Sequence, residues 1–433
     1  MSELYDAVII GGGPAGSTVA TALSRAGRRV VVLEKEKFPR FHVGESLLPY
    51  SLPILEKLGV LEKVRAAGFQ KKYGAFFWND QTGHDTIRPV VFRDAADDQH
   101  PMAYQVKRAE FDELLLRHSA SCGAEVREEV RVDDVLFEGG RAVGVRATLP
   151  DGETQEIRAR VVVDASGQGA FLSRKFGNRT FDSRLKRAAL FAHYEGIRWP
   201  EGHVEGDILL PIDEGVWYWI IPFSDSTASV GAVFEPSVAK EASAPTLEGR
   251  FDWLIARSRR MPVLLEGSRR TSKVHSISDY SAYSGRMGGD GWVLAGDAAT
   301  FLDPVFSTGV FLALAMGIRA AAAVDRALAR HGRVDARDLA RYEKESRKLV
   351  QRFRRFVYNF YDPVFFEAFC TPDPPTPMRR AVTTVLAGGV ESPPLSLRIW
   401  TRLMLWGVGF DRFRRRIGLG PKPEAARREP TAA

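Results

Sequence analysis

The chain has few cysteines and no long apolar run. Its 433 residues contain two cysteines, Cys122 and Cys370, too few for a zinc site or a disulfide framework. We interpret both as free thiols in a reducing compartment. The longest apolar stretch, residues 311–324, is interrupted by Gly317 and Arg319 and falls short of the roughly 20 residues that span a bilayer. The N-terminus lacks the features of a signal peptide. These absences predict a cytoplasmic protein with no transmembrane segment and no bound metal.

Excess charge of one sign is also scarce outside the C-terminus. The chain has 61 Lys and Arg against 54 Asp and Glu, a net charge of +7. From Leu397 onward there are nine basic and three acidic residues, so this segment alone carries +6. The nearly neutral body argues against a protein that binds nucleic acid. With 45% hydrophobic and 27% charged residues, the composition is that of a globular chain of two or three structural units.

The first residues follow the pattern of a dinucleotide-binding βαβ unit. An apolar run, residues 5–10, leads into a glycine-rich loop, residues 11–16, and a helix is expected over residues 15–26. The glycines of such a loop permit a tight turn, close approach to a pyrophosphate, and packing of helix on strand. Glu34 ends the second strand and is placed to accept ribose hydroxyls. The predicted cofactor contacts in this unit are Gly11, Gly13, Pro14, Ala15, Gly16, Glu34 and Lys35. No second fingerprint of this kind occurs, so we expect one dinucleotide and no dedicated nicotinamide site.

Three further segments indicate which dinucleotide is bound. Residues 291–297 form an apolar strand ending in Gly-Asp, residues 105–108 precede a helix, and residues 162–167 end a strand in Asp-Ala-Ser-Gly. Their order resembles the group I FAD-dependent monooxygenases. The resemblance implies that Asp297 binds the ribityl chain and that Arg108 lies near the pyrophosphate. Residues 38–46 resemble the loop near the flavin in that family, which adds Arg40 and Ser46 to the FAD contacts.

This resemblance implies an α/β fold with a Rossmann-like FAD-binding domain, similar to that of para-hydroxybenzoate hydroxylase. We expect an FAD-binding, monooxygenase-like module over residues 1–335. It is discontinuous, with a substrate-domain β-sheet inserted at about residues 75–105 and 186–275. Residues 336–433 are expected to form a helical C-terminal region with a basic tail.

Three motifs resemble one branch of that superfamily, the flavin-dependent halogenases. Residues 217–222 match the WxWxIP motif, residues 301–309 match FxxPxxSxG, and residues 69–74 match the Phe-x-x-Lys-x-Gly setting of the active-site lysine. The resemblance implies that Lys72 is catalytic, with Lys71 as the alternative because the doublet leaves the register open by one residue. It also implies a substrate tunnel lined by Trp217, Trp219, Ile221, Pro304, Phe306 and Ser307.

The FxxPxxSxG motif also predicts a halide site. Residues 307–309 open a helix, and backbone N–H groups at such a point form an anion nest. We therefore expect Thr308 and Gly309 to bind the halide, with Gly309 also at the FAD.

The resemblance as a whole predicts a halogenase. It implies FADH2 from a separate flavin reductase, dioxygen, and chloride or bromide. Through a flavin hydroperoxide these would give hypohalous acid, which Lys72 directs to an electron-rich aromatic ring. Phe306 stands where tryptophan halogenases have a glutamate, which favours a phenol or pyrrole, either free or tethered to an acyl or peptidyl carrier protein. Two alternatives stay open: an FAD monooxygenase that hydroxylates or epoxidises without halide, and a non-catalytic flavoprotein-fold binding module.

The C-terminal segment has the pattern of an amphipathic helix. Between Leu397 and Ile417, apolar residues recur mostly at three- and four-residue intervals among arginines. We expect the apolar face, which is Leu397, Ile399, Leu403, Trp406, Phe410, Phe413 and Ile417, to pack on the protein's own body. Docking of an acidic carrier protein and contact with an anionic membrane are the alternatives.

Overall fold

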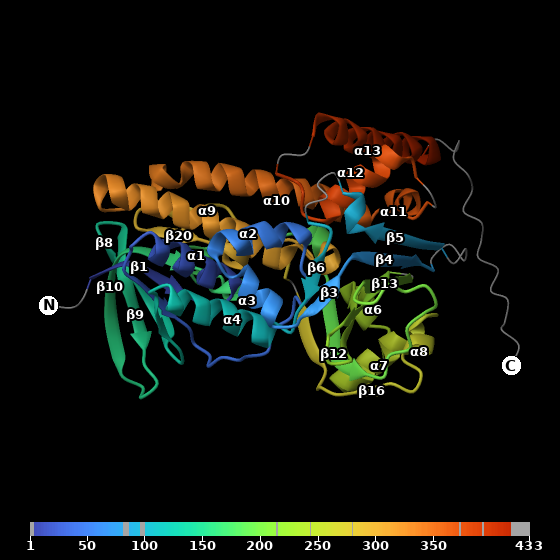
Figure 1. The fold of residues 1–433 in the computed structure, drawn as a ribbon, viewed down its shortest axis with the longest axis horizontal. Helices are drawn as coiled ribbons and strands as arrows, with labels where there is room; N and C mark the ends of the chain where they lie inside the picture. The colour runs from blue at the N-terminus through green and yellow to red at the C-terminus, as the bar shows by residue number, and fades with distance from the viewer. Residues whose placement is uncertain are drawn as a thin grey trace, which may run out of the picture. The chain divides into compact units, whose positions relative to one another are not determined.

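The chain divides into two compact units (Figure 1). The structure is a computed structural model and describes residues 4–80, 86–95, 100–213, 215–242, 244–278, 280–371, 374–391 and 394–416. Unit 1 comprises Met1–Gln70, Ala103–Lys186 and Asp279–Arg355; unit 2 comprises Lys71–Met102, Arg187–Ser278 and Phe356–Ala433. Unit 2 thus joins two inserted segments to the C-terminal helices. Ile417 and the predicted basic tail lie outside the described residues.

Unit 1 is built on a Rossmann-like sheet, as the sequence predicts. The strand order is β19-β20-β10-β1-β2-β7, and neighbours from β20 to β7 run parallel. The strands are β1 (Leu4–Ile10), β2 (Val30–Leu33), β7 (Glu125–Arg127), β10 (Thr154–Asp164), β19 (Gly288–Gly289) and β20 (Trp292–Leu294), with β8 (Arg131–Glu138) and β9 (Arg141–Thr148) attached through β10. All four residues of β2 are buried, because a parallel sheet covered on both faces excludes water from its central strands.

Helices α1 (Pro14–Arg25) and α4 (Arg108–Ser121) pack on this sheet, α1 against β1 and β2 and α4 against β7. The other helices of unit 1 are α2 (Leu52–Leu58), α3 (Leu61–Ala66), α5 (Phe171–Lys175), α9 (Thr308–His331) and most of α10 (Ala340–Phe360). Helix α9 approaches α1 closely at Gly317, where a Cβ atom would lie 2.9 Å from Thr18 Cγ2. Among the described residues, α9 is the one helix long and apolar enough to cross a membrane, and 72% of its most apolar window is buried inside the protein. Burial to that extent is the behaviour of a core helix.

Smaller elements complete unit 1. A three-stranded sheet has the order β11-β18-β21. The strands and 3-10 helices are β6 (Ala103–Gln105), β11 (Arg179–Phe181), β18 (Ala282–Ser284), β21 (Thr300–Phe301), η1 (Pro49–Ser51), η3 (Gly167–Gly169), η4 (Ser183–Leu185), η5 (Gly296–Ala298), η6 (Pro304–Phe306) and η7 (Ala336–Leu339). The chain leaves unit 1 through β3 (Gln70–Lys72) and returns at β6.

Unit 2 is built on a second sheet, with the order β16-β12-β15-β14-β13-β4-β5 and β17 paired to β12. Its strands are β4 (Gly74–Asn79), β5 (Thr86–Val91), β12 (Ala188–Glu195), β13 (Ile208–Asp213), β14 (Val216–Pro222), β15 (Thr227–Phe234), β16 (Arg269–Arg270) and β17 (His275–Ser278). Strand β14 carries Tyr218 and Ile220 into an apolar core with Phe251 and Leu254 of helix α7 (Leu247–Arg257). Helices α6 (Pro236–Ala239) and α8 (Met261–Leu264) and the 3-10 helix η2 (Phe92–Asp94) complete the insertion.

The C-terminal helices belong to unit 2. They are α11 (Pro363–Phe369), α12 (Thr376–Leu386) and α13 (Leu395–Arg416). Phe77 of β4 meets Phe360 and Phe369 edge to face, with ring centroids 6.0 and 4.9 Å apart. Aromatic side chains from this segment thus form part of the core of unit 2.

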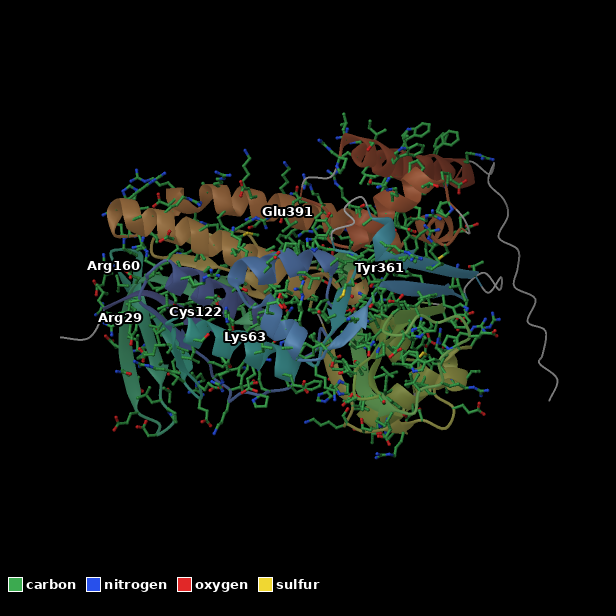
Figure 2. All side chains as sticks on the ribbon, viewed as in Figure 1. Arg29, Lys63, Cys122, Arg160, Tyr361 and Glu391 are labelled. Atoms are coloured by element: carbon green, nitrogen blue, oxygen red, sulfur yellow. The ribbon has the colours of Figure 1, made fainter. Side chains whose placement is uncertain are left out.

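Helix α13 contradicts the expectation that its predicted apolar face packs on the body. It contacts α11 and α12, and its buried apolar side chains are Leu397, Met404 and Val408. Leu395 is 68% exposed, and the other described residues of the predicted face are 47 to 70% exposed: Ile399, Leu403, Trp406, Phe410 and Phe413. Ring side chains stand out from α13 in Figure 2. The helix has apolar residues on two sides, and the smaller set faces the protein.

Candidate functional site

Parallel pairing brings the predicted cofactor residues to one edge of the sheet of unit 1. Ile10 is level with Leu33 and Asp164, and Asp164 is level with Leu294. The residues that follow these strand ends are Gly11, Glu34, Ala165 and the turn that contains Asp297. The carboxyl ends of parallel strands in an open α/β sheet are where ligands bind.

The glycine-rich loop has the geometry expected of a pyrophosphate cradle. Gly11 has a φ of +98°, and a Cβ atom there would lie 2.7 Å from the Ala165 carbonyl oxygen. A Cβ atom at Gly16 would lie 1.9 Å from the Gly11 carbonyl oxygen, so only glycine allows α1 to pack against the turn. A Cβ atom at Gly13 would have Arg40 Nη2 as its nearest neighbour, 3.4 Å away. The loop therefore has space above Gly13, at the helix N-terminus.

The first turn of α1 has no side-chain cap, and Pro14 occupies its first position. Uncapped backbone N–H groups and the helix dipole favour an anion at this point. Pro14 and Ala15, the first two residues of α1, are buried.

Glu34 is buried at the end of β2 and is held by backbone donors. Gly12 N–H donates to its Oε2 at 2.7 Å and Glu36 N–H donates to its Oε1 at 2.9 Å. Each carboxylate oxygen keeps a second lone pair for a ribose hydroxyl. Lys35 lies on the surface, with 68% of its side chain exposed next to Glu36.

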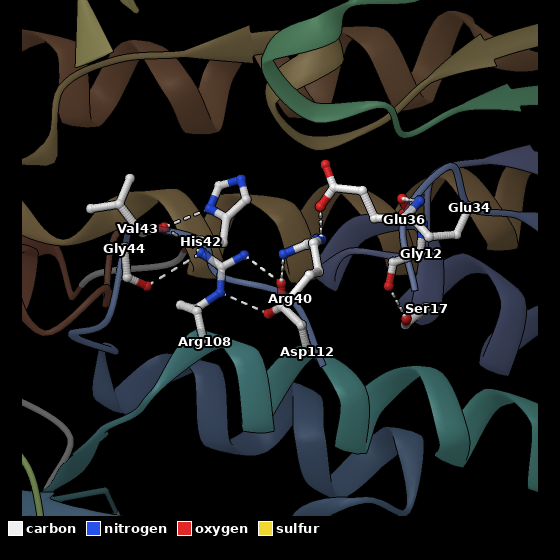
Figure 3. A network of polar contacts seen from close by, with 10 residues as sticks. All are labelled: Gly12, Ser17, Glu34, Glu36, Arg40, His42, Val43, Gly44, Arg108 and Asp112. Atoms are coloured by element: carbon white, nitrogen blue, oxygen red, sulfur yellow. Dashed lines mark hydrogen bonds and ion pairs between the residues drawn. The ribbon is translucent and has the colours of Figure 1, made fainter. Parts of the chain in front are cut away.

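Arg40 and Arg108 meet at one buried carboxylate, Asp112 (Figure 3). Arg108 donates to both oxygens of Asp112, at 2.7 and 2.8 Å, and to the Val43 carbonyl at 2.8 Å. Arg40 Nη1 donates to the same carboxylate at 3.1 Å. Burial would raise the pKa of Asp112, but Arg108 and Arg40 outweigh burial and lower it. Two guanidinium groups are therefore fixed in place near the loop.

His42 lies in the same network. Its Nδ1 donates to the Val43 carbonyl at 2.7 Å. Burial and then the Arg108 charge lower the pKa of His42 to about 4, so the imidazole is neutral near pH 7.

Asp297 lies on η5, and unit 1 holds its side chain through two residues of the β10–β11 region. Gln168 Nε2 donates to its Oδ2 at 3.1 Å, and Arg179 Nη2 donates to Gln168 Oε1 at 3.0 Å. Burial raises the pKa of Asp297 to about 6. A partly desolvated acceptor at the cofactor edge is suited to hydroxyl groups.

The start of α9 is a strained turn. Ser307 has a φ of +55°, which is uncommon for a residue with a Cβ atom, and it follows η6, where Phe306 is buried and Pro304 is half-buried. Thr308 is buried, and no side chain caps the helix. A Cβ atom at Gly309 would lie 3.2 Å from the Phe301 ring. Ser46, also buried in unit 1, forms an isolated bridge with Gln105.

The two lysines of the doublet differ in burial. Lys72 is 2% exposed and its Nζ lies 5.1 Å from the centroid of the Phe92 ring, whereas Lys71 is exposed. Side chains alternate along a strand, so one lysine of such a pair points inward and the other outward. Burial lowers the pKa of Lys72 to about 7, and the negative charge of Asp207 opposes that shift.

The tryptophan strand presents its predicted face to aromatic and polar partners in unit 2. Trp217, Trp219 and Ile221 are all buried. Trp217 Nε1 donates to Tyr361 Oη at 2.9 Å, and Trp219 Nε1 donates to Ser229 Oγ at 3.0 Å. The Trp219 ring covers Gly231, where a Cβ atom would lie 2.2 Å from the ring.

Four residues at these places carry no role in the sequence analysis. Asp112 is four residues after Arg108 on a helix, and that spacing signals an ion pair. Asp207 and Tyr361 meet their partners across 133 and 144 residues, so no local pattern reveals these contacts. Arg179 is only 11 residues from Gln168, but no motif marks that pair.

These residues fit FAD. The uncapped N–H groups at α1 and the guanidinium groups fixed by Asp112 suit a pyrophosphate, and Glu34 and Asp297 suit hydroxyl groups of ribose and ribityl.

Comparison with known proteins agrees with this assignment. Residues 4–357 match the family described as FAD binding domain. The chain is 33% identical over 411 residues to the 1H-pyrrole-2-carbonyl-[peptidyl-carrier protein] chlorinase of Pseudomonas fluorescens, covering 90% of each protein. It is 34% identical over 361 residues to the tryptophan 2-halogenase of Chondromyces crocatus, covering 82% of this chain and 67% of that protein.

A solved structure also resembles this fold throughout. That of the flavin-dependent brominase Bmp2 superposes with a TM-score of 0.83 at 29% identity, covering 96% of this chain and 100% of the brominase. An FAD-binding fold over most of the chain, together with halogenase relatives above 30% identity over most of their length, shows the family. The chain is a member of the flavin-dependent halogenases, which are FAD-binding oxidoreductases.

Proposed function

We propose that this halogenase transfers chlorine or bromine from hypohalous acid to an electron-rich aromatic ring, a phenol or a pyrrole, and that Lys72 directs the transfer. The observation that carries the proposal is the burial of a lysine beside an aromatic ring, with its neighbour Lys71 at the surface. Burial of an ammonium group costs free energy of folding, so buried lysines occur mainly where they have a functional role.

The N-terminus of α9 is the proposed halide site. The backbone N–H groups of Thr308 and Gly309 have no side-chain cap, and such groups bind anions. Bound FAD in its reduced form supplies, with dioxygen, the oxidising equivalents that convert halide into hypohalous acid. We infer that a separate flavin reductase supplies the reduced cofactor, because the sequence holds a single dinucleotide fingerprint.

Lys72 has two forms available near neutral pH, since its pKa is about 7. The ammonium can donate a hydrogen bond to hypohalous acid and polarise its O–halogen bond. The amine can instead take the halogen, forming an N–halogen bond and releasing water. In either case the halogen passes to a ring carbon, and that carbon loses its proton. The aromatic face of Trp217 and Trp219 suits a flat ring.

A phenol or pyrrole is favoured over tryptophan because Phe306 offers no acid at the place where tryptophan halogenases have a glutamate. The similarity to a tryptophan 2-halogenase makes tryptophan the comparison substrate. The chain, FAD, a flavin reductase, NADH and bromide or chloride would be incubated with free phenols, pyrroles and tryptophan. Halogenated phenol or pyrrole is the expected product by mass spectrometry. Hydroxylated product without halide dependence would support the monooxygenase alternative instead.

Lys72→Met tests the lysine, with Lys71→Met as the matched control. We expect the Lys72 variant to bind FAD and consume dioxygen while halogenation falls at least about 100-fold, the range for removal of one proton-transferring group. The Lys71 variant should keep its rate. Full halogenation by Lys72→Met would remove the proposed role.

We further propose that α13 docks an acidic carrier protein that bears the substrate. Its six exposed apolar side chains lie within an arc of about 80° at 100° per residue. Arg398 and Arg402 are exposed beside that arc. An apolar helix face flanked by cations fits a partner with an acidic rim around an apolar patch. The pyrrole chlorinase relative acts on a carrier-bound substrate.

The double variant Arg398→Glu with Arg402→Glu is expected to raise KM for a carrier-tethered pyrrole and to leave a free analogue unaffected. Arg286→Glu, at an exposed arginine of unit 1, is the control. An equal effect on both substrates would contradict docking at α13. Dimers in light scattering that Trp406→Ser dissociates, or sedimentation with anionic vesicles, would assign the surface to a second copy or to a membrane.

A further inference from the structure

The backbone immediately after Lys72 is fastened by one buried carboxylate. Asp207 precedes β13, which runs parallel to β4, and it is 2% exposed. Its Oδ1 accepts hydrogen bonds from the N–H groups of Tyr73 and Gly74, at 2.7 and 2.6 Å. The two donors are the first two residues after the lysine, so the carboxylate holds the junction between β3 and β4.

The junction is shaped to admit this carboxylate. A Cβ atom at Gly74 would lie 2.9 Å from Asp207 Oδ2 and 2.3 Å from the Val90 carbonyl oxygen. A side chain at position 74 would therefore push the carboxylate away from the N–H groups that it accepts. This gives a physical reason for the glycine in the Phe-x-x-Lys-x-Gly motif of this chain.

Asp207 is itself held by the loop before it. Its N–H donates to the Val204 carbonyl at 3.0 Å, and its carbonyl accepts from His203 Nε2 at 2.8 Å. The His203 ring stacks on Trp199, with centroids 4.6 Å apart, and it also contacts Phe76. The carboxylate thus comes from an ordered loop rather than from a freely rotating surface residue.

The charges of Asp207 and Lys72 act on each other. Asp207 is the group that opposes the effect of burial on Lys72. Burial raises the pKa of Asp207, while the Tyr73 and Gly74 N–H groups, Lys72 and His203 oppose that rise. Among the described residues, the His203 ring also acts on the charge of Asp207.

We propose that Asp207 is a positioning residue for Lys72: it fixes the backbone that presents the amine and supplies the negative charge that acts on it. The inference rests on the proposed role of Lys72, and it adds a carboxylate 135 residues away in the sequence to the halogenating apparatus. Asp207 touches no reacting atom; it acts through the lysine.

Asp207→Asn separates charge from geometry, because an amide oxygen still accepts from both N–H groups. Lysine Nζ is labelled and followed by NMR as a function of pH, and the Lys72 resonance is identified by its absence in Lys72→Met. The inflection of the Lys72 titration, its pH midpoint, should fall by about one unit in Asp207→Asn, the lower end of the effect of one opposite charge. The limb of the halogenation rate–pH profile that belongs to Lys72 should move with it. Asp213→Asn, at the far end of β13, the strand that Asp207 precedes, should leave both unmoved.

Asp207→Glu keeps the charge and displaces the oxygens by one methylene. We expect the Lys72 inflection to stay near its wild-type value while kcat falls and KM changes little. An unmoved inflection in Asp207→Asn, or unchanged kcat in Asp207→Glu, would overturn the inference. If Asp207→Asn does not fold, Asp207→Glu carries the test. If Lys72→Met halogenates normally, the proposed function fails, whereas the shift of the Lys72 resonance in Asp207→Asn still reports on the charge interaction between Asp207 and Lys72.

Discussion

The two units bury charge in different ways. In unit 1, Arg108 and Asp112 are both nearly inaccessible to water and are joined by two hydrogen bonds, with Arg40 adding a third. In unit 2, Lys72 is just as buried, and the negative charge of Asp207 opposes the effect of burial on it. The acid of the first group is held ionised, while the lysine of the second has its pKa lowered to about 7.

The difference separates a fixed charge from a reactive one. A guanidinium locked to a carboxylate keeps its charge and its place, which suits recognition of a phosphate. A lysine near its midpoint at neutral pH can donate or accept at little cost, which suits chemistry. Unit 1 is organised to hold a cofactor and unit 2 carries the candidate reactive group.

The glycine loop of unit 1 should show the largest effects. Gly16→Val places a branched side chain where a Cβ atom already lies 1.9 Å from a carbonyl oxygen, so we expect loss of folded protein. Gly13→Val meets only the end of Arg40, so the fold should survive while FAD binding is lost to steric exclusion of the pyrophosphate. Thermal melting and flavin absorbance after purification measure the two effects. A Gly13→Val protein with a full flavin spectrum would contradict the assignment of this loop.

Breaking the paired charge of unit 1 comes next. Arg108→Met leaves Asp112 buried with Arg40 alone, and loss of one partner of a buried pair costs about 3–5 kcal/mol. Arg117→Met on the same helix removes an arginine that is 47% exposed and pairs with Glu113 and Glu128, and it should cost about 0–1 kcal/mol. The free energy of unfolding in urea measures both variants. Equal losses of stability would contradict the expected difference between a buried and an exposed ion pair.

Replacing the buried lysine of unit 2 should stabilise the fold, whereas replacing Arg108 of unit 1 should destabilise it. Lys72 has a pKa of about 7 in the folded protein and about 10.5 when unfolded, so the unfolded state binds more protons between these values. Its burial therefore destabilises the fold fully below pH 7, and the penalty fades as the pH rises to 10.5. Lys72→Met should unfold at higher urea than the wild type at pH 6, and the difference should shrink by pH 10. A constant difference across that range would mean that Lys72 titrates normally.

A smaller effect is expected at the tryptophan strand. Tyr361→Phe removes the acceptor of the buried Trp217 N–H, and an unsatisfied buried donor costs about 1–3 kcal/mol. The double variant Trp217→Phe with Tyr361→Phe removes donor and acceptor together. It should lose less stability than the sum of the losses in Trp217→Phe and in Tyr361→Phe. Urea unfolding of the three variants completes the cycle, and strict additivity would show that the bond contributes nothing.

The sequence predicts unit 1 well because its requirements are local. Gly11, Gly16 and Glu34 lie within one βαβ unit, and parallel pairing then brings Asp297 to the same edge. The sequence does not decide between Lys71 and Lys72, because side chains alternate along β3 and only the position of the strand relative to the core shows which one points inward.

Unit 2 is less predictable because its contacts are long in sequence. Trp217 and Tyr361 are 144 residues apart, and no motif links them. On α13, the periodicity predicts one apolar face that includes Leu397, whereas the structure buries Leu397 with Met404 and Val408 and leaves the aromatic side exposed. The choice depends on α11 and α12, which the helix's own pattern does not describe.

The close fit of Trp219 over Gly231 has a consequence for protein engineering. A methyl group at position 231 would overlap the indole ring, so this site cannot accept the small-to-large changes with which pockets are usually reshaped. The ring is also tethered through Ser229 and lies beside Phe191. Libraries that aim to move this indole should therefore vary positions 191 and 229 and leave 231 as glycine.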